Sequence, residues 1–393
     1  MRVLVSAAAF PAGISGIQRH AVNLARALLM HPEIEAVLFV AAPWQRKIAC
    51  SADFPVGGRL SVHIEGMARG ALGRNLWYYR RLPELARTLK ADLVHLSYPV
   101  PTDARAFGCP VVVTLHDLYP YEIPLNFGFP KFLFNRIVLQ QCLANASAIT
   151  CVSDTTVQRL AHYFPLATAK VSRIHNCVEP MPSCAWRAPI AKWGRSRFLL
   201  CVAQHRRNKN LPLLIDTFYL LAESGAIDAS TQLVIVGMRG PETARIQRRI
   251  VRHGLGDRVH CVEGLSDAEL NWCYAHCEVL VAPSVVEGFG LPVAEALLAG
   301  CKVVCSDIPA HREVGGTNCH FVTLCARAAR AFADAIADAL REPRRTPVAL
   351  PQLAAANLGR QYVDVYQRLL AFSSIERSAA FSVLEPSSGQ QPL

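Results

Sequence analysis

Two carboxylates eight positions apart mark the segment of this 393-residue chain that is best equipped for chemistry. Glu287 opens the run E-G-F-G-L-P, and Glu295 follows three positions after Pro292. Pro292 fits the first position of a helix, where its missing N–H costs nothing, and the glycines let a ligand approach the backbone. Free N–H groups at the helix start favour a phosphate. One carboxylate for a sugar and one for a ribose would suit a sugar nucleotide; an acidic helix start favoured by the macrodipole is the alternative.

Three other turns carry candidate residues. The basic loop after the apolar run Phe198–Val202 contains Arg206, Arg207 and Lys209, which suit a diphosphate unless the loop is merely solvated. His116 and Asp117 end another apolar run, where a lone histidine is more often structural than catalytic. Gly16 follows the first strand, but Gly13-x-x-Gly16 lacks the G-x-G-x-x-G spacing of nicotinamide enzymes.

Short β-branched runs alternate with helical patterns, which predicts an α/β fold of two Rossmann-like, doubly wound domains facing a central cleft. The expected strands are Val3–Ser6, Val37–Val40, Leu93–Leu96, Val111–Leu115, Ile149–Val152, Phe198–Val202, Gln232–Val236, Val259–Val262, Val279–Ala282 and Val303–Ser306. The expected helices are Ile17–Leu29, Leu76–Leu89, Leu211–Ala222, Pro241–Arg252, Asp267–His276, Pro292–Ala299 and Leu353–Leu370.

Proline-rich sequence around residues 179–189 predicts a linker between domains at 1–182 and 190–352. A helix at 353–372 would follow and can cross back to the first domain. Residues 373–393 are rich in Ser, Pro and Gln and are predicted to form a disordered tail.

Composition limits the class of partner. A net charge of +11 calls for nucleic acid, an anionic membrane or a phosphorylated ligand, and 52% hydrophobic residues allow a large core. No run of 18 apolar residues occurs, so no membrane-spanning helix is expected. The 14 cysteines are scattered, mostly in apolar runs, which indicates reduced core residues and a cytoplasmic protein.

Beyond these patterns, the run from Ala282 to Val314 resembles the retaining glycosyltransferases of family 4, which have the GT-B fold. The resemblance extends over nearly the whole chain to about residue 370, and H-D-L-Y-P at 116–120 is similar to mannosyltransferase-like members. It implies a first domain that binds the acceptor and a second domain that binds a nucleotide sugar.

The resemblance also implies a role for each candidate. In the second domain, Glu287 would contact the transferred sugar and Glu295 the ribose. The other expected donor contacts are the backbone of Gly288, Phe289, Gly290 and Leu291, the Lys209 side chain, and either Arg206 or Arg207. The choice between the two arginines stays open because Gln204 stands where the family often has an arginine.

In the first domain, the resemblance implies that His116 faces the donor and that Asp117 orients the imidazole or binds the acceptor. Gly16 would line the phosphate side of the cleft. Ser153 and Asn176 also match family positions and are expected to be mainly structural.

No D-x-D triplet occurs, so we expect basic groups and a helix N-terminus, rather than a metal, to neutralise the leaving diphosphate. The expected reaction is transfer with retention from a nucleoside diphosphate sugar, without a further cofactor. GDP-mannose is slightly favoured over UDP-glucose and a UDP-N-acetylhexosamine. The expected acceptor is a hydroxyl of a glycan or lipid-linked glycan in surface polysaccharide biosynthesis.

Three alternative functions are compatible with parts of the sequence. The E-G-F-G-L-P run argues against a nucleotide-sugar epimerase, and the short first domain argues against a starch-type synthase. An inactive homologue that acts as a scaffold is supported by Gln204, but the presence of Glu287, Glu295, Lys209 and His116 argues against it.

Residues 69–90 suggest where a membrane could meet the protein. They combine six Lys or Arg residues and three aromatic residues with a single acid, Glu84. This composition suits the inner face of an anionic membrane or a lipid-diphosphate acceptor, and an ordinary amphipathic helix is the alternative. No nucleic-acid motif accompanies it, so nucleic acid is not an expected partner.

Overall fold

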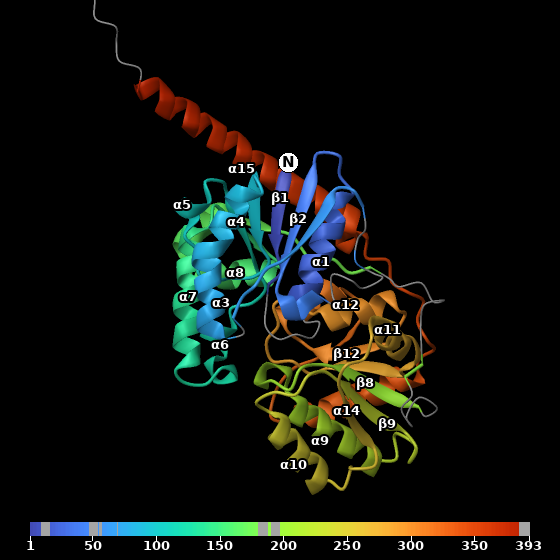
Figure 1. Cartoon of the computed structure of the whole chain (residues 1–393). Helices are drawn as coiled ribbons and strands as arrows, with labels where there is room; N and C mark the ends of the chain where they lie inside the picture. Colours follow the sequence, from blue (N-terminus) through green and yellow to red (C-terminus); the bar gives the residue numbers. More distant parts are fainter. Residues whose placement is uncertain are drawn as a thin grey trace, which may run out of the picture.

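A computed structural model describes residues 1–8, 16–46, 54, 57–68, 70–179, 188–189 and 197–384, with side chains up to residue 372. Two fully parallel sheets, each flanked by helices, form two domains stacked along the long direction of the molecule (Figure 1). The predicted α/β architecture of two doubly wound domains is therefore confirmed.

The sheet of the first domain has seven strands in the order β3-β2-β1-β4-β5-β6-β7. They are β1 (Arg2–Ser6), β2 (Ala36–Ala41), β3 (Leu60–Ile64), β4 (Leu93–Leu96), β5 (Val111–Leu115), β6 (Ala148–Cys151) and β7 (Val171–Arg173). The strands β3 and β7 were not expected from the sequence. Both are edge strands with no fully buried residue, so neither carries the continuous apolar run that a central parallel strand shows.

Helices cover both faces of this sheet. They are α1 (Gly16–Leu29), η1 (Pro43–Gln45), α3 (Ala71–Leu76), η2 (Trp77–Arg81), α4 (Leu82–Thr88), α5 (Ala104–Phe107), α6 (Tyr119–Glu122), η3 (Pro124–Asn126), α7 (Lys131–Asn145), α8 (Asp154–Tyr163) and η4 (Pro165–Lys170). Side chains of η2, α4, α7 and α8 share one core cluster, while α1 packs on the opposite face.

The sheet of the second domain has six strands in the order β10-β9-β8-β11-β12-β13. They are β8 (Phe198–Val202), β9 (Gln232–Val236), β10 (Val259–Val262), β11 (Val279–Ala282), β12 (Val303–Ser306) and β13 (His320–Val322). The flanking helices are η7 (Arg207–Lys209), α9 (Leu211–Glu223), α10 (Thr243–Arg252), α11 (Asp267–His276), α12 (Leu291–Leu298), α13 (Pro309–Gly315), α14 (Ala328–Arg341) and η8 (Pro351–Leu353). Five strands match the expected ranges; the short edge strand β13 was missed.

The last helix, α15 (Ala355–Leu384), returns to the first domain (Figure 1). Its residues Leu358, Tyr362, Val363 and Tyr366 share a buried cluster with β1, β2 and α1. The helix is longer than expected: the prediction of a disordered tail from residue 373 is wrong as far as Leu384, because the helical backbone continues there. Residues 385–393 and most of the expected linker lie outside the described residues.

The fold bears on two expectations from composition, the one on membrane-spanning helices and the one on cysteines. Within the described residues, no helix is long and apolar enough to cross a membrane. The twelve described cysteines are all free thiols, seven of them fully buried, as expected of reduced core residues.

Candidate active site between the two domains

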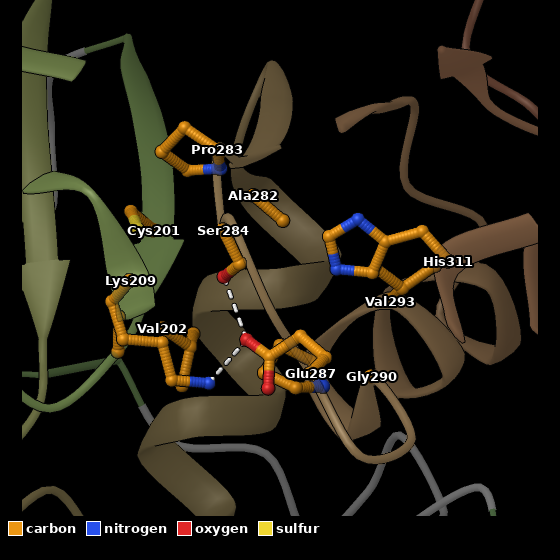
Figure 2. A pocket seen from close by; sticks show the side chains of 12 residues that line it. Cys201, Val202, Lys209, Ala282, Pro283, Ser284, Glu287, Gly290, Val293 and His311 are labelled. Carbon is orange, nitrogen blue, oxygen red and sulfur yellow. Dashed lines mark hydrogen bonds and ion pairs between the residues drawn. The ribbon is translucent and has the colours of Figure 1, made fainter. Parts of the chain in front are cut away.

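Glu287 is the centre of the candidate site. It follows β11 and is 7% exposed, in a small pocket lined by Lys209, Ser284, Gly290 and His311 among others (Figure 2). Its Oε1 accepts hydrogen bonds from Lys209 Nζ at 2.5 Å and Ser284 Oγ at 2.6 Å. Burial alone would raise the pKa of Glu287, but the Lys209 ammonium holds this pKa below its ordinary value. The carboxylate is therefore ionised and fixed in direction.

The first domain reaches the same carboxylate. Tyr119, at the start of α6, donates its hydroxyl to Glu287 Oε2 at 3.2 Å. Asn208 in η7 in turn donates to the Tyr119 hydroxyl at 3.2 Å. Asn126 at the end of η3 donates to Asn208 Oδ1 at 3.2 Å, so polar side chains from both domains meet across the cleft.

Gly288 lies in close contact with the first domain. A Cβ atom at this position would stand 1.8 Å from the carbonyl oxygen of His116, so only glycine fits. The Gly288 carbonyl accepts hydrogen bonds from the hydroxyls of Ser153 and Thr156 at the start of α8, the latter at 3.1 Å. Arg159 of the same helix donates to the Glu287 carbonyl at 2.9 Å. The backbone of residues 287–288 is thus held by the first domain.

His116 and Asp117 come to the cleft together at the end of β5. His116 Nε2 lies 2.9 Å from the Ser97 carbonyl, and burial lowers the pKa of His116 to about 4, so its imidazole is neutral at pH 7. Burial raises the pKa of Asp117 to about 6, an effect that Arg206 and Lys209 oppose. Asp117 therefore faces the cations of the second domain from across the cleft.

Glu295 lies about one turn inside α12, as expected, and both of its carboxylate oxygens already bind protein side chains. Its Oε1 binds Arg19 of α1 at 2.8 Å, and its Oε2 accepts a hydrogen bond from the Tyr274 hydroxyl at 2.6 Å. Arg19 also binds Asp267, the first residue of α11. Burial disfavours the charge of Arg19, but the Glu295 and Asp267 carboxylates raise its pKa above the ordinary value. Arg19 is a bridge between the domains.

The glycine-containing turn before α12 adopts the conformation that its sequence requires. Gly290 has a φ of 99°, in the region that side chains avoid, and it caps α12. The Phe289 ring is buried in the core of the second domain, so this residue can offer a ligand its backbone only. Leu291 lies opposite Gly16: a Cβ on Gly16 would stand 3.8 Å from the Leu291 side chain. The starts of α1 and α12 therefore meet at the cleft.

The two adjacent arginines differ in their surroundings. Arg207 Nε lies 3.3 Å from Glu242 Oε1, and its backbone N–H donates to Asn126. Arg206 makes no ion pair with any residue in the described part of the chain, and its charge acts on Asp117 across the cleft.

Behind the cleft, a row of buried polar groups crosses the sheet of the first domain. Tyr366 of α15 binds His95 at 2.6 Å, and His95 and His20 both bind the Thr114 hydroxyl, at 2.8 and 3.2 Å. Asn176 binds the other nitrogen of His20 at 3.1 Å, which is a structural contact. The His20 ring packs edge-on against His116, with the ring centroids 4.7 Å apart. This network fixes His116 from behind.

Sequence reasoning brought together Glu287, Lys209, His116 and Asp117, and it missed their partners. Two of these partners, Ser284 and Tyr119, lie inside the motifs that contain Glu287 and His116. Ser284 stands three residues before Glu287 and Tyr119 three residues after His116, and this spacing of a hydroxyl from a motif residue could have pointed to them. Arg19 had no such signal, since its partner Glu295 is 276 residues away. Among the described residues, no group of three or more His, Cys, Asp or Glu side chains could hold a metal ion.

Comparisons with known proteins identify the family of this chain. The profile of the family described as Glycosyl transferases group 1 matches residues 185–352, and that of Glycosyltransferase Family 4 matches residues 14–181. The O-antigen chain mannosyltransferase RfbU of Salmonella typhimurium is 29% identical over 202 residues, which are 51% of this chain and about half (53%) of RfbU. O-antigen chain mannosyltransferase B of Escherichia coli is 23% identical over 329 residues, 80% of this chain and 85% of that protein.

Solved structures share the fold. The structure of WaaG, a glycosyltransferase involved in lipopolysaccharide biosynthesis, is similar with a TM-score of 0.64 and 17% identity, covering 95% of this chain and 98% of WaaG. Anabaena Alr3699/HepE, solved in complex with UDP and glucose, has a TM-score of 0.62 and 16% identity, covering 98% and 100% of the two chains. Since the two profiles together match both domains, the chain belongs to the group 1 glycosyltransferases, with a family 4 first domain and the GT-B fold.

Proposed function

We propose that the protein transfers a hexosyl residue, with mannose from GDP-mannose favoured, to a hydroxyl of a glycan or lipid-linked glycan in surface polysaccharide biosynthesis. One observation carries this proposal: the Glu287–Lys209 pair at the start of α12 lies opposite His116 and Asp117 at the domain boundary. The similarity to two O-antigen mannosyltransferases supports the choice of sugar and pathway.

Each donor group would find a partner of suitable charge. The diphosphate would lie at the starts of α12 and α1, against Lys209 and the backbone of Gly290 and Leu291. Of the two arginines, we propose Arg206 for the diphosphate, because Arg207 is paired with Glu242. Glu295 would bind the ribose after exchanging Arg19 for the ribose hydroxyls.

The reaction would proceed with retention and without a metal. The bond between the anomeric carbon and the phosphate oxygen breaks, the bond to the acceptor oxygen forms, and the acceptor proton passes to the leaving phosphate. Lys209 and Arg206 would stabilise the departing diphosphate, and neutral His116 would hydrogen-bond the sugar or phosphate. Asp117, with its raised pKa, would bind the acceptor hydroxyl or orient the imidazole. We place this reaction in the cytoplasm, at the inner face of the membrane.

The first experiment is a thermal-shift screen of the purified protein against GDP-, UDP-, ADP- and dTDP-sugars, with and without EDTA. A nucleotide sugar at about 100 times its dissociation constant should add about 2.7 kcal/mol to the stability of the fold. We expect GDP-mannose to raise the melting temperature equally in EDTA, and Glu295→Ala to lose this response.

Asp267→Ala is the matched control, because Asp267 is the other carboxylate that binds Arg19 and is not assigned to the ribose. It should keep the response to the nucleotide sugar. If no sugar nucleotide stabilises the native protein, the proposal fails and an inactive scaffold becomes the better explanation. The anomeric configuration of the product, read by NMR, tests retention separately.

A further inference from the structure

Apolar side chains gather on the outer side of the first domain. Among the residues with described side chains, fourteen large hydrophobic residues are exposed, and eight of them belong to two short segments, 72–79 and 125–137. We call them the outer apolar surface: Leu72, Leu76, Tyr79, Leu125, Phe129, Leu133, Phe134 and Ile137. Phe129 is 81% exposed and Ile137 64%, so these side chains project into the surroundings instead of packing on the domain. Contiguous exposed apolar patches usually mark an interaction site.

The two segments cover the same face of the sheet. Trp77 and Tyr78 of η2 and Leu139 and Leu143 of α7 lie in one buried cluster, so their helices form one layer. Exposed residues of that layer point away from the sheet. Figure 1 shows α3, α6 and α7 along one side of the first domain, opposite α1 and α15. The cation-rich residues 69–90 thus have an apolar neighbour, the helix α7 (Figure 1). This neighbour was not expected from the sequence.

The charges in and around these two segments are mostly positive. Residues 123–153 contain no acid at all, and residues 66–91 contain only Glu84. Arg81 pairs with Glu84 and Glu65. In contrast, the exposed Arg80 and Lys131 make no ion pair with any residue that the structure describes. Apolar side chains beside unpaired cations are suited to lipid: the apolar groups enter the headgroup boundary while the cations meet lipid phosphates.

We propose that the outer apolar surface seats this protein on an anionic lipid bilayer. The surface borders the cleft, since Asn126, next to Leu125, binds Asn208 and the Arg207 N–H of the second domain. A lipid-anchored acceptor would therefore enter the cleft directly from the bilayer. This last point rests on the proposed function, whereas bilayer binding itself does not.

The test is co-sedimentation of the full chain with vesicles of phosphatidylcholine alone and with about 30% phosphatidylglycerol. Binding should need phosphatidylglycerol and should fall in high salt. Phe129→Ser with Ile137→Ser should weaken it about tenfold or more. Lys131→Ala should weaken it about fivefold. The matched control is Met30→Ser with Val251→Ser: both side chains are exposed, one at the end of α1 and the other on α10 of the second domain.

Three results would overturn the proposal. The first is that the protein does not bind anionic vesicles, and the second is that the control and surface variants lose vesicle binding equally. The third is that the protein self-associates and the surface substitutions abolish this self-association. The nucleotide thermal shift is measured on the same variants and should be unchanged, because the outer apolar surface lies outside the donor site. A failure of vesicle binding with an intact thermal shift would remove the bilayer proposal alone, and the reverse result would remove the proposed reaction alone.

Discussion

At the scale of single residues, the site depends on charges buried against each other. Lys209 Nζ and Glu287 Oε1 are 2.5 Å apart, and Glu287 is nearly inaccessible to water. Lys209→Met would leave an uncompensated buried carboxylate and should lower the free energy of unfolding by about 3–5 kcal/mol. Urea-induced unfolding measures this. Lys209→Met combined with Glu287→Gln should recover part of the loss, and a double variant no more stable than the single one would contradict the argument.

Asp117 offers a test by pH. Burial raises the pKa of Asp117 to about 6 in the folded protein, from an ordinary value of 3.8. The native state therefore holds this proton more tightly, and ionisation costs stability as the pH rises from about 3.8 to 6. Asp117→Asn keeps an oxygen for the Tyr119 N–H and removes this cost, so it should be up to about 3 kcal/mol more stable than the wild type at pH 7.

The difference between Asp117→Asn and the wild type should shrink to about 0.5 kcal/mol at pH 4, because the native carboxyl is then protonated and the unfolded one only partly ionised. Unfolding curves at the two pH values measure it. An equal difference at pH 4 and pH 7 would mean that some other property of the asparagine is responsible.

The sequence was informative for residues on loops that follow strands. His116 and Asp117 directly follow β5, and Lys209 and Glu287 lie on the loops after β8 and β11. These side chains come together because the carboxyl ends of parallel strands share one edge, while their roles remain predictions. Prediction from the sequence failed for Arg19, because the contact with Glu295 depends on how two separately folding sheets face each other. No local pattern encodes that geometry.

At the scale of elements, the central strands and the edge strand β10 were predictable, whereas the other three edge strands were not. Each central strand is a buried apolar run, whereas β3, β7 and β13 are partly exposed and mixed in composition. The helix α7 also escaped notice because it is apolar on both its buried and its exposed side, as Leu139 and Ile137 show, and so lacks an amphipathic pattern.

The docking of α15 on the sheet should be sensitive to acid. Burial lowers the pKa of His95, the partner of Tyr366, to about 3, and also lowers the pKa of His20. When folding lowers the pKa of a histidine, the native state favours the neutral imidazole. The native state is then fully stable above the unfolded pKa of about 6.5, and it loses stability as the pH falls below that value. At pH 5, His95 should cost about 2 kcal/mol of stability, and His20 should add a cost of the same sign.

His95→Gln should therefore reduce the loss of unfolding free energy between pH 7 and pH 5 by about 2 kcal/mol relative to the wild type. Parallel urea titrations at the two pH values provide the measurement. His253→Gln is the control, because this histidine is bound to Asp216 at a site in the second domain. If both variants change the pH dependence equally, the burial of His95 is not its source.

At the scale of the whole molecule, Arg19 of the first domain holds the second domain by binding two of its carboxylates, Glu295 and Asp267. Charged hydrogen bonds of this kind contribute about 1.5–3 kcal/mol each. Arg19→Met should therefore shift the protein towards more open arrangements, seen as a larger radius of gyration by small-angle X-ray scattering. Arg26→Met, on the same helix but directed at Glu179, is the control. An unchanged scattering curve for Arg19→Met would show that the remaining contacts suffice for closure.

The return of α15 has a consequence for how the chain is made. The sheet of the first domain leaves the ribosome early, yet the face beside β1 and α1 is covered by Leu358, Tyr362 and Tyr366, near the other end of the chain. At about 5–20 residues per second, synthesis of the whole second domain delays that cover by roughly 10–40 s. During this interval the nascent first domain exposes an apolar face. A stalled or truncated product that lacks α15 should therefore be a substrate for chaperones and proteases, even though its sheet is complete.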